Sequence, residues 1–471
     1  MQAPEPIDPL TEFATASALA AAVAARQVGA LELCDAAIRR IEARDGALNA
    51  VVVRDFERAR AEARERDSTS MGGASGPLFG VPMTVKEAFN VVGLPSTWGL
   101  PPFLGHLARA DAVLVARLRA AGAVILGKTN VATALADWQC DNPVYGQTLN
   151  PHDPARTPGG SSGGAAAALA AGMVPLELGS DIGGSIRVPA HFCGVFGHKP
   201  SFALLPMRGH DFPGTEGAPV DLAVGGPMAR SATDLALALS VLAGPDADDA
   251  VAYRLDLPTP RHTGLAGARI LLLDAHPGCA TDSSIRDALG ALAARLADAG
   301  AQVAHASALV PDLEAAHETY VAMLVAITTR GDPSAGPPIS AHAWMALLDQ
   351  RDRVRRRWRA LFEDAFGVVL MPPFGTAAFE HLTEPDLDRR TLIVDGRHEP
   401  YVAQLAWPGV ASLAGLPVTV APIAATPAGL PIGVQIMGPW LEDRTTIAFA
   451  AALEAAGLAR ARTAVPGSAG G

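Results

Sequence analysis

Short apolar segments alternate with longer amphipathic segments along most of this chain. The strand-like "AVIL" at 123–126 follows a helical pattern at 111–121, and the strand-like "ARILLLD" at 268–274 precedes another helical pattern at 285–296. A glycine ends each helical pattern, and "AQVAHA" at 301–306 resumes as a strand. Strands buried on both faces are continuous apolar runs, so this alternation predicts an α/β fold around a mostly buried sheet.

Further segments extend this architecture. "VVLMPP", "LPVTVAP" and "LPIGVQIMG", at 368–373, 416–422 and 430–438, are strand-like and end at proline or glycine. Between residues 15 and 44 the apolar spacing is helical, and Gly29 divides the pattern into two helices. The polar, glycine-rich "DSTSMGGASGP" after these helices predicts a loop.

The composition excludes several classes of protein. Of the 471 residues 49% are hydrophobic and 18% are charged, against about 25% charged in typical chains, so the chain is not disordered. A net charge of -11 argues against a nucleic-acid partner, whose phosphates would be repelled. No apolar stretch reaches the ~18 residues that cross a bilayer, and "MQAPEPIDPLTEF" at the start lacks the basic and apolar regions of a signal peptide.

The cysteines are scattered, at Cys34, Cys140, Cys193 and Cys279, without a CxxC pair. Four in this length do not make a disulfide framework, and none has a nearby histidine that would indicate a metal site. We therefore expect a cytoplasmic protein with no membrane partner and no bound metal.

The densest basic segment is "RDRVRRRWRALFED" at 351–364. Its apolar residues fall on one stripe at helical spacing, which predicts an amphipathic helix with a solvated basic face. The stripe consists of Leu347, Val354, Trp358, Leu361 and Ala365.

Two motif matches are weak in their context. "GAVILGKT" at 122–129 fits GxxxxGK[ST], but its middle residues belong in a strand, whereas a phosphate loop needs exposed backbone amides. "GGSSG" at 159–163 fits the GxSxG of a nucleophile elbow, but the polar "NPHDPARTP" precedes it where an apolar strand is needed. None of the twelve histidines is marked by its context as the base of such an elbow. Nucleotide binding and an α/β-hydrolase elbow are therefore both disfavoured.

Two serines lie beside paired glycines, Ser161 in "TPGGSSGGAAAALAAG" and Ser185 in "SDIGGSIRVPA". Glycine lets backbone amides approach a bound atom, so successive amides before Ser185 predict an oxyanion hole. A serine hydroxyl needs a base, and Lys86 in "GVPMTVKEAFNVVG" is the candidate, because burial among apolar residues favours the neutral amine. Taken alone, Lys86 is also compatible with a strand-edge lysine whose amine reaches water.

"PGGSSGG" and "SDIGGSIRVPAHFCGVFGHKP", with "GVPMTVKEAFNV" before them, resemble the signature and the lysine segment of the amidase signature family. The spacing of Lys86, Ser161 and Ser185 also agrees with that family. Further matches are "GAVILGKTN", "GPMARSATDLALALSVLAG" and "AGLPVTVAPIAATPAGLPIGVQIMG". The resemblance covers nearly the whole chain and is weakest at about 205–225 and 310–400.

The resemblance implies one large domain over residues 1–471, with a mixed central sheet wrapped by helices. Its expected parts are N-terminal helices at 10–65, a signature core at 77–245, a variable substrate-loop region at 250–400, and a C-terminal sheet and helix at 401–460.

The resemblance also implies roles for the site residues. Ser185 would form an acyl-enzyme, Ser161 would bridge it to Lys86, and the peptide bond before Ser161 would be cis. The oxyanion would be held by the backbone amides of Ile182, Gly183, Gly184 and Ser185. The expected supporting residues are Ser162, Ser180, Asp181 and Arg187; Ser162 also suits the N-cap of the following helix, and Arg187 suits an ion pair with Asp181 or an exposed carboxylate.

The pocket is expected to form from "LADWQCDNPVYGQ" at 135–147 and from the long loops "PMRGHDFPGTEGAP" at 206–219 and "GDPSAGPP" at 331–338. Its candidate residues are Leu135, Ala136, Trp138 and Tyr145. Ordinary loop packing explains Trp138 and Tyr145 equally well.

The implied reaction is acyl transfer to water from small-molecule amides, with anilides, esters and carbamates (urethanes) left open. It needs no metal or organic cofactor, and its rate should fall as Lys86 protonates at low pH. The alternative is an amidotransferase A-type subunit that requires a partner; "LPMRGHDFPGTEGAPVDL" departs from that subunit's pattern. A homodimer is also left open.

Overall fold

The computed structural model describes residues 10–11, 13–69, 76–215, 219–329 and 338–464. Within these ranges, eleven strands form one sheet in the order β1-β3-β2-β4-β6-β5-β12-β13-β9-β7-β8, and β10 and β11 form a separate pair. The strands are β1 (Val51–Arg54), β2 (Pro82–Lys86), β3 (Val124–Thr129), β4 (Leu176–Asp181), β5 (Phe196–Lys199), β6 (Val224–Ala229), β7 (Arg269–Leu272), β8 (Gln302–Ala304), β9 (Val368–Met371), β10 (Thr391–Val394), β11 (Arg397–Pro400), β12 (Val418–Ala425) and β13 (Pro431–Met437).

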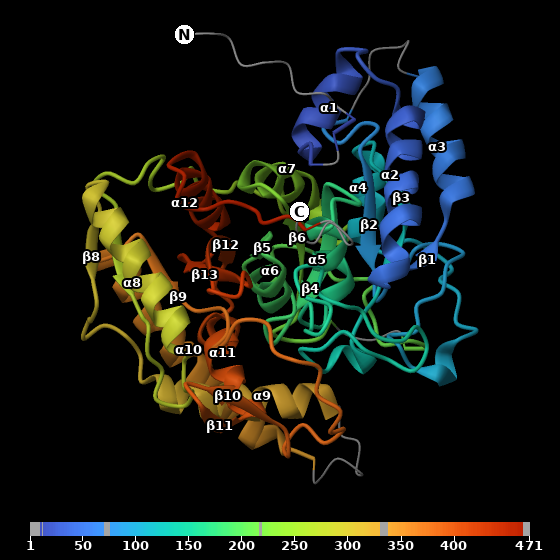
Figure 1. Ribbon diagram of the computed structural model, residues 1–471. Coiled ribbons are helices and arrows are strands. Elements are labelled where there is room, and N and C mark those ends of the chain that lie inside the picture. Colours follow the sequence, from blue (N-terminus) through green and yellow to red (C-terminus); the bar gives the residue numbers. More distant parts are fainter. Residues whose placement is uncertain (1–9, 12, 70–75, 216–218, 330–337, 465–471) are drawn as a thin grey trace.

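Helices flank this sheet (Figure 1). They are α1 (Ala16–Ala24), α2 (Ala30–Arg44), α3 (Phe56–Thr69), α4 (Val113–Ala120), α5 (Gly163–Ala170), α6 (Arg187–Cys193), α7 (Ala232–Leu242), α8 (Ser283–Asp298), α9 (Leu313–Thr329), α10 (Ala341–Asp364), α11 (Ala406–Ala414) and α12 (Asp443–Ala455). The expected single α/β domain with a mixed central sheet and flanking helices is therefore confirmed.

The sheet mixes parallel and antiparallel neighbours. β2 runs parallel to both β3 and β4, and β7 runs parallel to both β8 and β9, whereas the remaining pairs are antiparallel. Because parallel neighbours end at the same edge of a sheet, Lys86 at the end of β2 lies near Ser180 and Asp181 at the end of β4. The topology thus brings together two segments that are far apart in the sequence.

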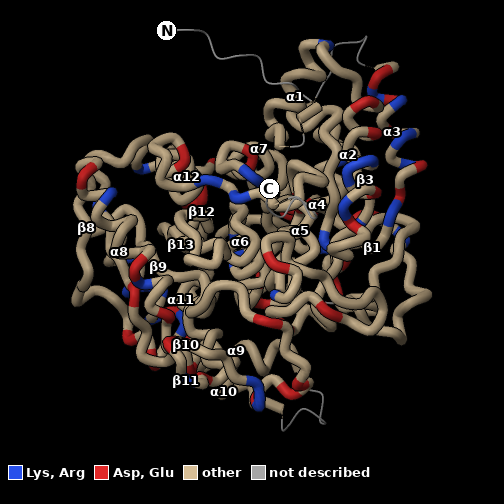
Figure 2. Tube along the Cα trace, viewed as in Figure 1, with Lys and Arg blue, Asp and Glu red and all other residues tan. Residues whose placement is uncertain are grey.

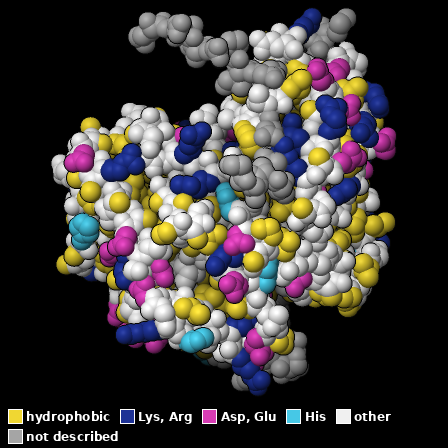
Figure 3. Space-filling model, in the orientation of Figure 1, with side chains coloured by type: hydrophobic (Ala, Val, Ile, Leu, Met, Phe, Trp, Pro, Cys, Tyr) yellow, Lys and Arg dark blue, Asp and Glu magenta, His cyan; other side chains and the backbone are white. Residues whose placement is uncertain are grey.

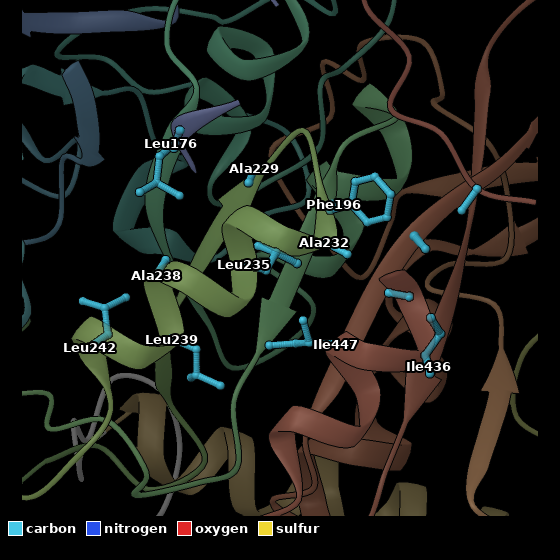
Figure 4. Packing of buried hydrophobic residues seen from close by; sticks show 14 of the residues in the cluster. Leu176, Phe196, Ala229, Ala232, Leu235, Ala238, Leu239, Leu242, Ile436 and Ile447 are labelled. Atoms are coloured by element: carbon cyan, nitrogen blue, oxygen red, sulfur yellow. The ribbon is translucent and has the colours of Figure 1, made fainter. Parts of the chain in front are cut away.

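Both faces of the sheet are buried. In β7, Ile270 and Leu272 pack into one hydrophobic cluster, with α1, α4, α7, α8 and α12, whereas Leu271 packs into the other, with α2, α5, α6, α10 and α11. Figure 4 labels Leu235 and Leu239 of α7 and Leu176 of β4, which all belong to the first cluster. The continuous apolar runs of the sequence reflect this burial on both faces.

The helix and loop boundaries predicted from the sequence differ little from those in the structure. Gly29 is the N-cap of α2, and the pattern at 111–121 forms α4. α3 continues to Thr69, so the glycine-rich segment begins as a helix. Its residues 70–75 lie outside the described ranges, as do 1–9 of the start of the chain.

The basic segment lies on α10, as its periodicity predicted. Trp358 and Leu361 are buried against the core. Arg351 pairs with Asp221 at 2.8 Å, and Arg355 donates to the Ala414 carbonyl at 3.0 Å. Figure 2 shows charged residues mainly on the outer helices and few on the central strands. On the face drawn in Figure 3, basic and acidic side chains are interspersed. Among the described helices, none has the length and apolar character needed to cross a bilayer.

Candidate active site

Lys86 ends β2, a strand whose five residues are all buried. Its amine is fully buried and donates hydrogen bonds to Ser161 Oγ at 2.7 Å and to the Ser180 carbonyl at 3.3 Å. Burial lowers the pKa of Lys86 to about 7, although the electrostatic effects of Asp181 and Cys140 act to raise it. Near neutral pH a large fraction of this amine is therefore uncharged.

Ser161 lies in the turn that enters α5 and is 1% exposed. The peptide bond between Gly160 and Ser161 is cis, as the family resemblance implied. Gly160 is required here, because a Cβ at this position would lie 2.3 Å from the Asp137 carbonyl oxygen. The loop of residues 137–139 and the Ser161 turn are therefore in direct backbone contact.

Ser162 takes the N-cap position of α5, but its side chain does not cap the helix. Its hydroxyl donates instead to the Ser180 carbonyl at 3.2 Å, and its amide donates to the Ser185 carbonyl at 3.2 Å. Ser162 thus ties the Ser161 turn to both β4 and the Ser185 turn, a contact between remote segments that local capping rules do not anticipate.

Ser185 lies in the tight turn between β4 and α6 and is 6% exposed. Gly184 has φ +97°, and a Cβ on it would lie 2.9 Å from both Pro408 Cγ and Val188 Cγ2. Its amide donates to Asp181 Oδ1 at 2.9 Å. In this structure the adjacent carboxylate therefore already binds one of the four amides that the family resemblance assigns to the oxyanion.

The other expected oxyanion amides belong to Ile182, Gly183 and Ser185. Two side chains hold the carbonyl groups of this turn: Trp138 Nε1 donates to the Gly183 carbonyl at 2.8 Å, and the Tyr320 hydroxyl donates to the Ile182 carbonyl at 2.9 Å. Fixing the carbonyls also fixes the planes of their peptide groups. Tyr320 comes from α9, where the family resemblance is weak, so no signal in the sequence identified it.

Asp181 and Arg187 form a fully buried ion pair at 2.8 Å. Burial alone would raise the pKa of Asp181, but the charge and hydrogen bonds of Arg187 hold it well below its usual range. The Asp181 carboxylate also accepts from the amide of Ile186 at 2.9 Å. Arg187 reaches further, to the Pro408 carbonyl, Gln435 Oε1 and Ser412 Oγ. The pair therefore fixes the Ser185 turn to α11 and β13.

A cavity of about 430 Å³ opens over these groups. Ser161, Ser180 and Ser185 line it, together with apolar side chains from several loops and helices. The apolar part of the lining includes Trp98, Leu135, Trp138, Met207, Phe212, Leu324, Ile327 and Leu405. This volume suits a small organic molecule.

The predicted pocket residues divide into two groups. Leu135, Ala136 and Trp138 line the cavity, whereas Tyr145 does not and donates its hydroxyl to Glu87 Oε1 at 3.0 Å. The loop at 206–219 contributes Met207, His210 and Phe212, as its length and position predicted. Residues 331–337 of the other long loop lie outside the described ranges. The lining from α9, such as Leu324, belongs to the expected substrate-loop region at 250–400, although no motif there identified individual residues.

The two weak motif matches are resolved by the fold. Residues 124–129 of "GAVILGKT" form the buried strand β3, so their amides are not exposed to a phosphate. The hydroxyl of Ser161 in "GGSSG" contacts a lysine amine and not an imidazole. Within the described part of the chain, no cluster of three or more acidic, histidine or cysteine side chains is arranged to hold a metal ion.

Comparison with known proteins places this geometry in a family. The sequence model of the amidase family matches residues 32–332 and 333–447. The chain is 37% identical over 459 residues to AtzE, a component of the 1-carboxybiuret hydrolase of Pseudomonas sp. strain ADP, covering 89% of this chain and 94% of that protein. It is 31% identical over 477 residues to the A-type subunit of the glutamyl-tRNA(Gln) amidotransferase of Psychrobacter cryohalolentis, covering 90% of this chain and 92% of that protein.

A solved structure agrees with these sequence relatives. The crystal structure of a bacterial aryl acylamidase of the amidase signature family has a TM-score of 0.79 and 25% identity, covering 95% of this chain and 97% of that one. The match extends over almost the entire fold.

Proposed function

The chain belongs to the amidase signature family, and from that premise we propose that it hydrolyses the C–N bond of small amides through an acyl-enzyme on Ser185. Its relatives are amidases and amide hydrolases that act on C–N bonds other than peptide bonds. The observation that carries the proposal is the buried contact of 2.7 Å between Lys86 Nζ and Ser161 Oγ, behind the wall of a cavity that also contains Ser185.

The first half of the reaction forms the acyl-enzyme. Ser185 Oγ attacks the carbonyl carbon and gives its proton to Ser161 Oγ, while Ser161 gives its own proton to neutral Lys86. The amides of Ile182, Gly183 and Ser185 stabilise the oxygen that becomes negative. As the C–N bond breaks, the leaving nitrogen takes a proton back from Ser161, which recovers one from Lys86.

The second half repeats these proton transfers with water in place of Ser185. Water attacks the acyl carbon and loses its proton through Ser161 to Lys86, and the Ser185 oxygen leaves and is protonated by the same route. Lys86 thus acts as a base in each attack and as an acid in each departure. The two half-reactions use only groups of this chain, the substrate and water.

The lining of the cavity supports uncharged substrates with an apolar acyl or aryl part. Trp98, Phe212 and Leu405 present apolar surface. Of the three aspartates in the lining, Asp137 and Asp181 are each paired with an arginine, and Asp211 accepts from the Gly209 amide. The likeness to an aryl acylamidase adds anilides to the candidates. Esters and carbamates have the same reacting carbonyl and are included.

A second candidate is an amidotransferase A-type subunit, favoured by the 31% identity to such a protein over 90% of this chain. The two candidates differ in their need for a partner. A self-sufficient hydrolase turns over amides as a purified single chain, whereas the amidotransferase component would be inert until its partner is added.

The test is a panel of anilides, primary amides, esters and carbamates, given to the purified chain and to its Ser185→Ala and Lys86→Met variants. We expect turnover by the parent only, and an acyl adduct on Ser185 by mass spectrometry after brief exposure to a slow ester. Turnover by Ser185→Ala at the parental rate would refute the mechanism. A parent that acts only in the presence of a partner protein would favour the second candidate.

A further inference from the structure

His210 lies in the 206–219 loop, between β5 and β6, and the mechanism above gives it no role. It lines the cavity and is 9% exposed. Its ring packs edge-on against Phe89, with 4.6 Å between the ring centroids, and against Trp98 at 5.3 Å. The imidazole is thus a fixed part of the cavity wall and not a surface histidine.

The contacts of His210 lead to Lys86 by two short routes. Its Nε2 lies 2.9 Å from Ser180 Oγ, and the Ser180 carbonyl accepts from Lys86 Nζ at 3.3 Å. On the other side, the amide of Phe89, whose ring packs on His210, donates to the Lys86 carbonyl at 3.0 Å. His210 therefore contacts two residues, Ser180 and Phe89, that are hydrogen-bonded to Lys86.

The loop that carries His210 is anchored beside β2. The amide of Asn90 donates to the Gly209 carbonyl at 2.8 Å, and the Gly209 amide donates to Asp211 Oδ2 at 3.0 Å. Gly209 has φ +90°, and a Cβ on it would lie 2.5 Å from Ala112 Cα. The imidazole is therefore held in place by its own backbone as well as by its ring contacts.

His210 is uncharged at the pH values where the lysine titrates. Burial, and then the charge of Lys86, lower the pKa of His210 to about 3. The groups that face Lys86 are Asp181 from β4, Cys140 from the loop before α5, and His210 itself. A neutral ring excludes water from the lysine without adding a charge of its own.

We propose that His210 is a positioning residue: its ring closes the cavity side of the space around Lys86 and holds Ser180, and so keeps the base dry and directed at Ser161. The proposal rests on the proposed role of Lys86 as the base. Lys86 is fully buried and does not line the cavity, whereas Ser180 and His210 do. Water that reaches the amine from the cavity therefore has to pass the wall that these residues form with Ser161.

The test measures the rate of Ser185 modification by a fluorophosphonate, and kcat/KM on an anilide, from pH 5 to pH 10. The parent should show an acidic limb with its midpoint near 7. In His210→Ala, water reaches the amine and its pKa rises, so the midpoint should move up by about one unit. The rate should then fall about tenfold at pH 6 and stay within about twofold of the parent at pH 9.5.

Matched variants separate sealing from general damage. His210→Phe keeps an apolar ring in the wall, so its midpoint should rise by no more than half as much as that of His210→Ala. His210→Asn removes the ring, keeps a hydrogen-bonding amide and should shift the midpoint as His210→Ala does, so it replaces that variant if His210→Ala does not fold. The control is His276→Ala, since His276 is a buried histidine that packs edge-on against Trp407 outside this cavity, and it should leave the midpoint unchanged.

The outcomes are distinct. A parental midpoint in both His210→Ala and His210→Asn, whatever their overall rates, would overturn the inference and leave the proposed function intact. A parent that hydrolyses no C–N substrate and does not react with the fluorophosphonate would overturn the proposed function, and this inference with it.

Discussion

Replacing Lys86 by methionine should make the protein inactive and, near neutral pH, more stable. In the folded chain burial lowers the pKa of Lys86 from 10.5 to about 7, whereas in the unfolded chain it keeps the higher value. Between these values the unfolded state binds the extra proton, so the stability of the parent rises with pH through this window. This titration lowers the free energy of unfolding of the parent, and we call the loss the penalty of the buried lysine. Well below pH 7 the penalty is complete, at about 5 kcal/mol, and at pH 7 it is about 4 kcal/mol.

Methionine has a side chain of similar length without the amine, so Lys86→Met removes this penalty. It also leaves Ser161 Oγ and the Ser180 carbonyl without their donor, at about 1 kcal/mol each. At pH 7 the variant should therefore unfold with a free energy about 2 kcal/mol higher than that of the parent. By pH 9.5 the remaining penalty is about 1 kcal/mol, so the advantage should disappear.

The assay is urea unfolding of both chains at pH 7 and pH 9.5, with hydrolysis of an anilide measured on the same preparations. The difference between the two chains isolates Lys86, because the other buried lysines with lowered pKa values, Lys128 and Lys199, are present in both. This difference should change by about 3 kcal/mol between the two pH values. An equal pH dependence in parent and variant would refute the account of Lys86 as a buried, largely neutral amine.

Three further substitutions test the remainder of the site. Ser185→Ala should lower kcat by about 10⁴-fold or more with an unchanged melting temperature, and a parental rate would exclude it as the nucleophile. Arg187→Leu leaves the buried Asp181 carboxylate unpaired and should cost about 3–5 kcal/mol of stability; a melting temperature equal to that of the parent would contradict this. Gly184→Ala places a Cβ against Pro408 and should lower kcat about 100-fold by displacing the oxyanion amides, with KM the control that should change little.

The sequence predicted those features that depend on local order. The apolar run 368–371 became β9 because a strand buried on both faces needs no polar position. The glycines around Ser185 likewise predicted a tight turn, since few other residues tolerate positive φ. The apolar neighbours of Lys86 on β2 were compatible with its burial, but also with a strand-edge lysine, and only the family resemblance favoured the buried amine.

Features that depend on contacts between remote segments were not accessible in this way. Ser162 gives its hydroxyl to β4 instead of capping its own helix. Tyr145 turns to Glu87, 58 residues away along the chain. In each case the competing partner becomes close only after the sheet has assembled, so spacing along the sequence carries no information about it.

The register of β4 determines whether the site can exist. Its six residues pair with β6 from Leu176 opposite Ala229 to Asp181 opposite Val224. Successive side chains of a strand point to opposite faces, so the Ser180 hydroxyl contacts His210, whereas the Asp181 carboxylate binds Arg187 and the Ser185 turn. The backbone carbonyl of Ser180 accepts from Lys86. A slip by one residue would exchange these faces and separate the lysine from its carbonyl partner and the turn from its carboxylate. The base and the oxyanion turn are therefore aligned by one set of backbone hydrogen bonds, and neither can be repositioned without the other.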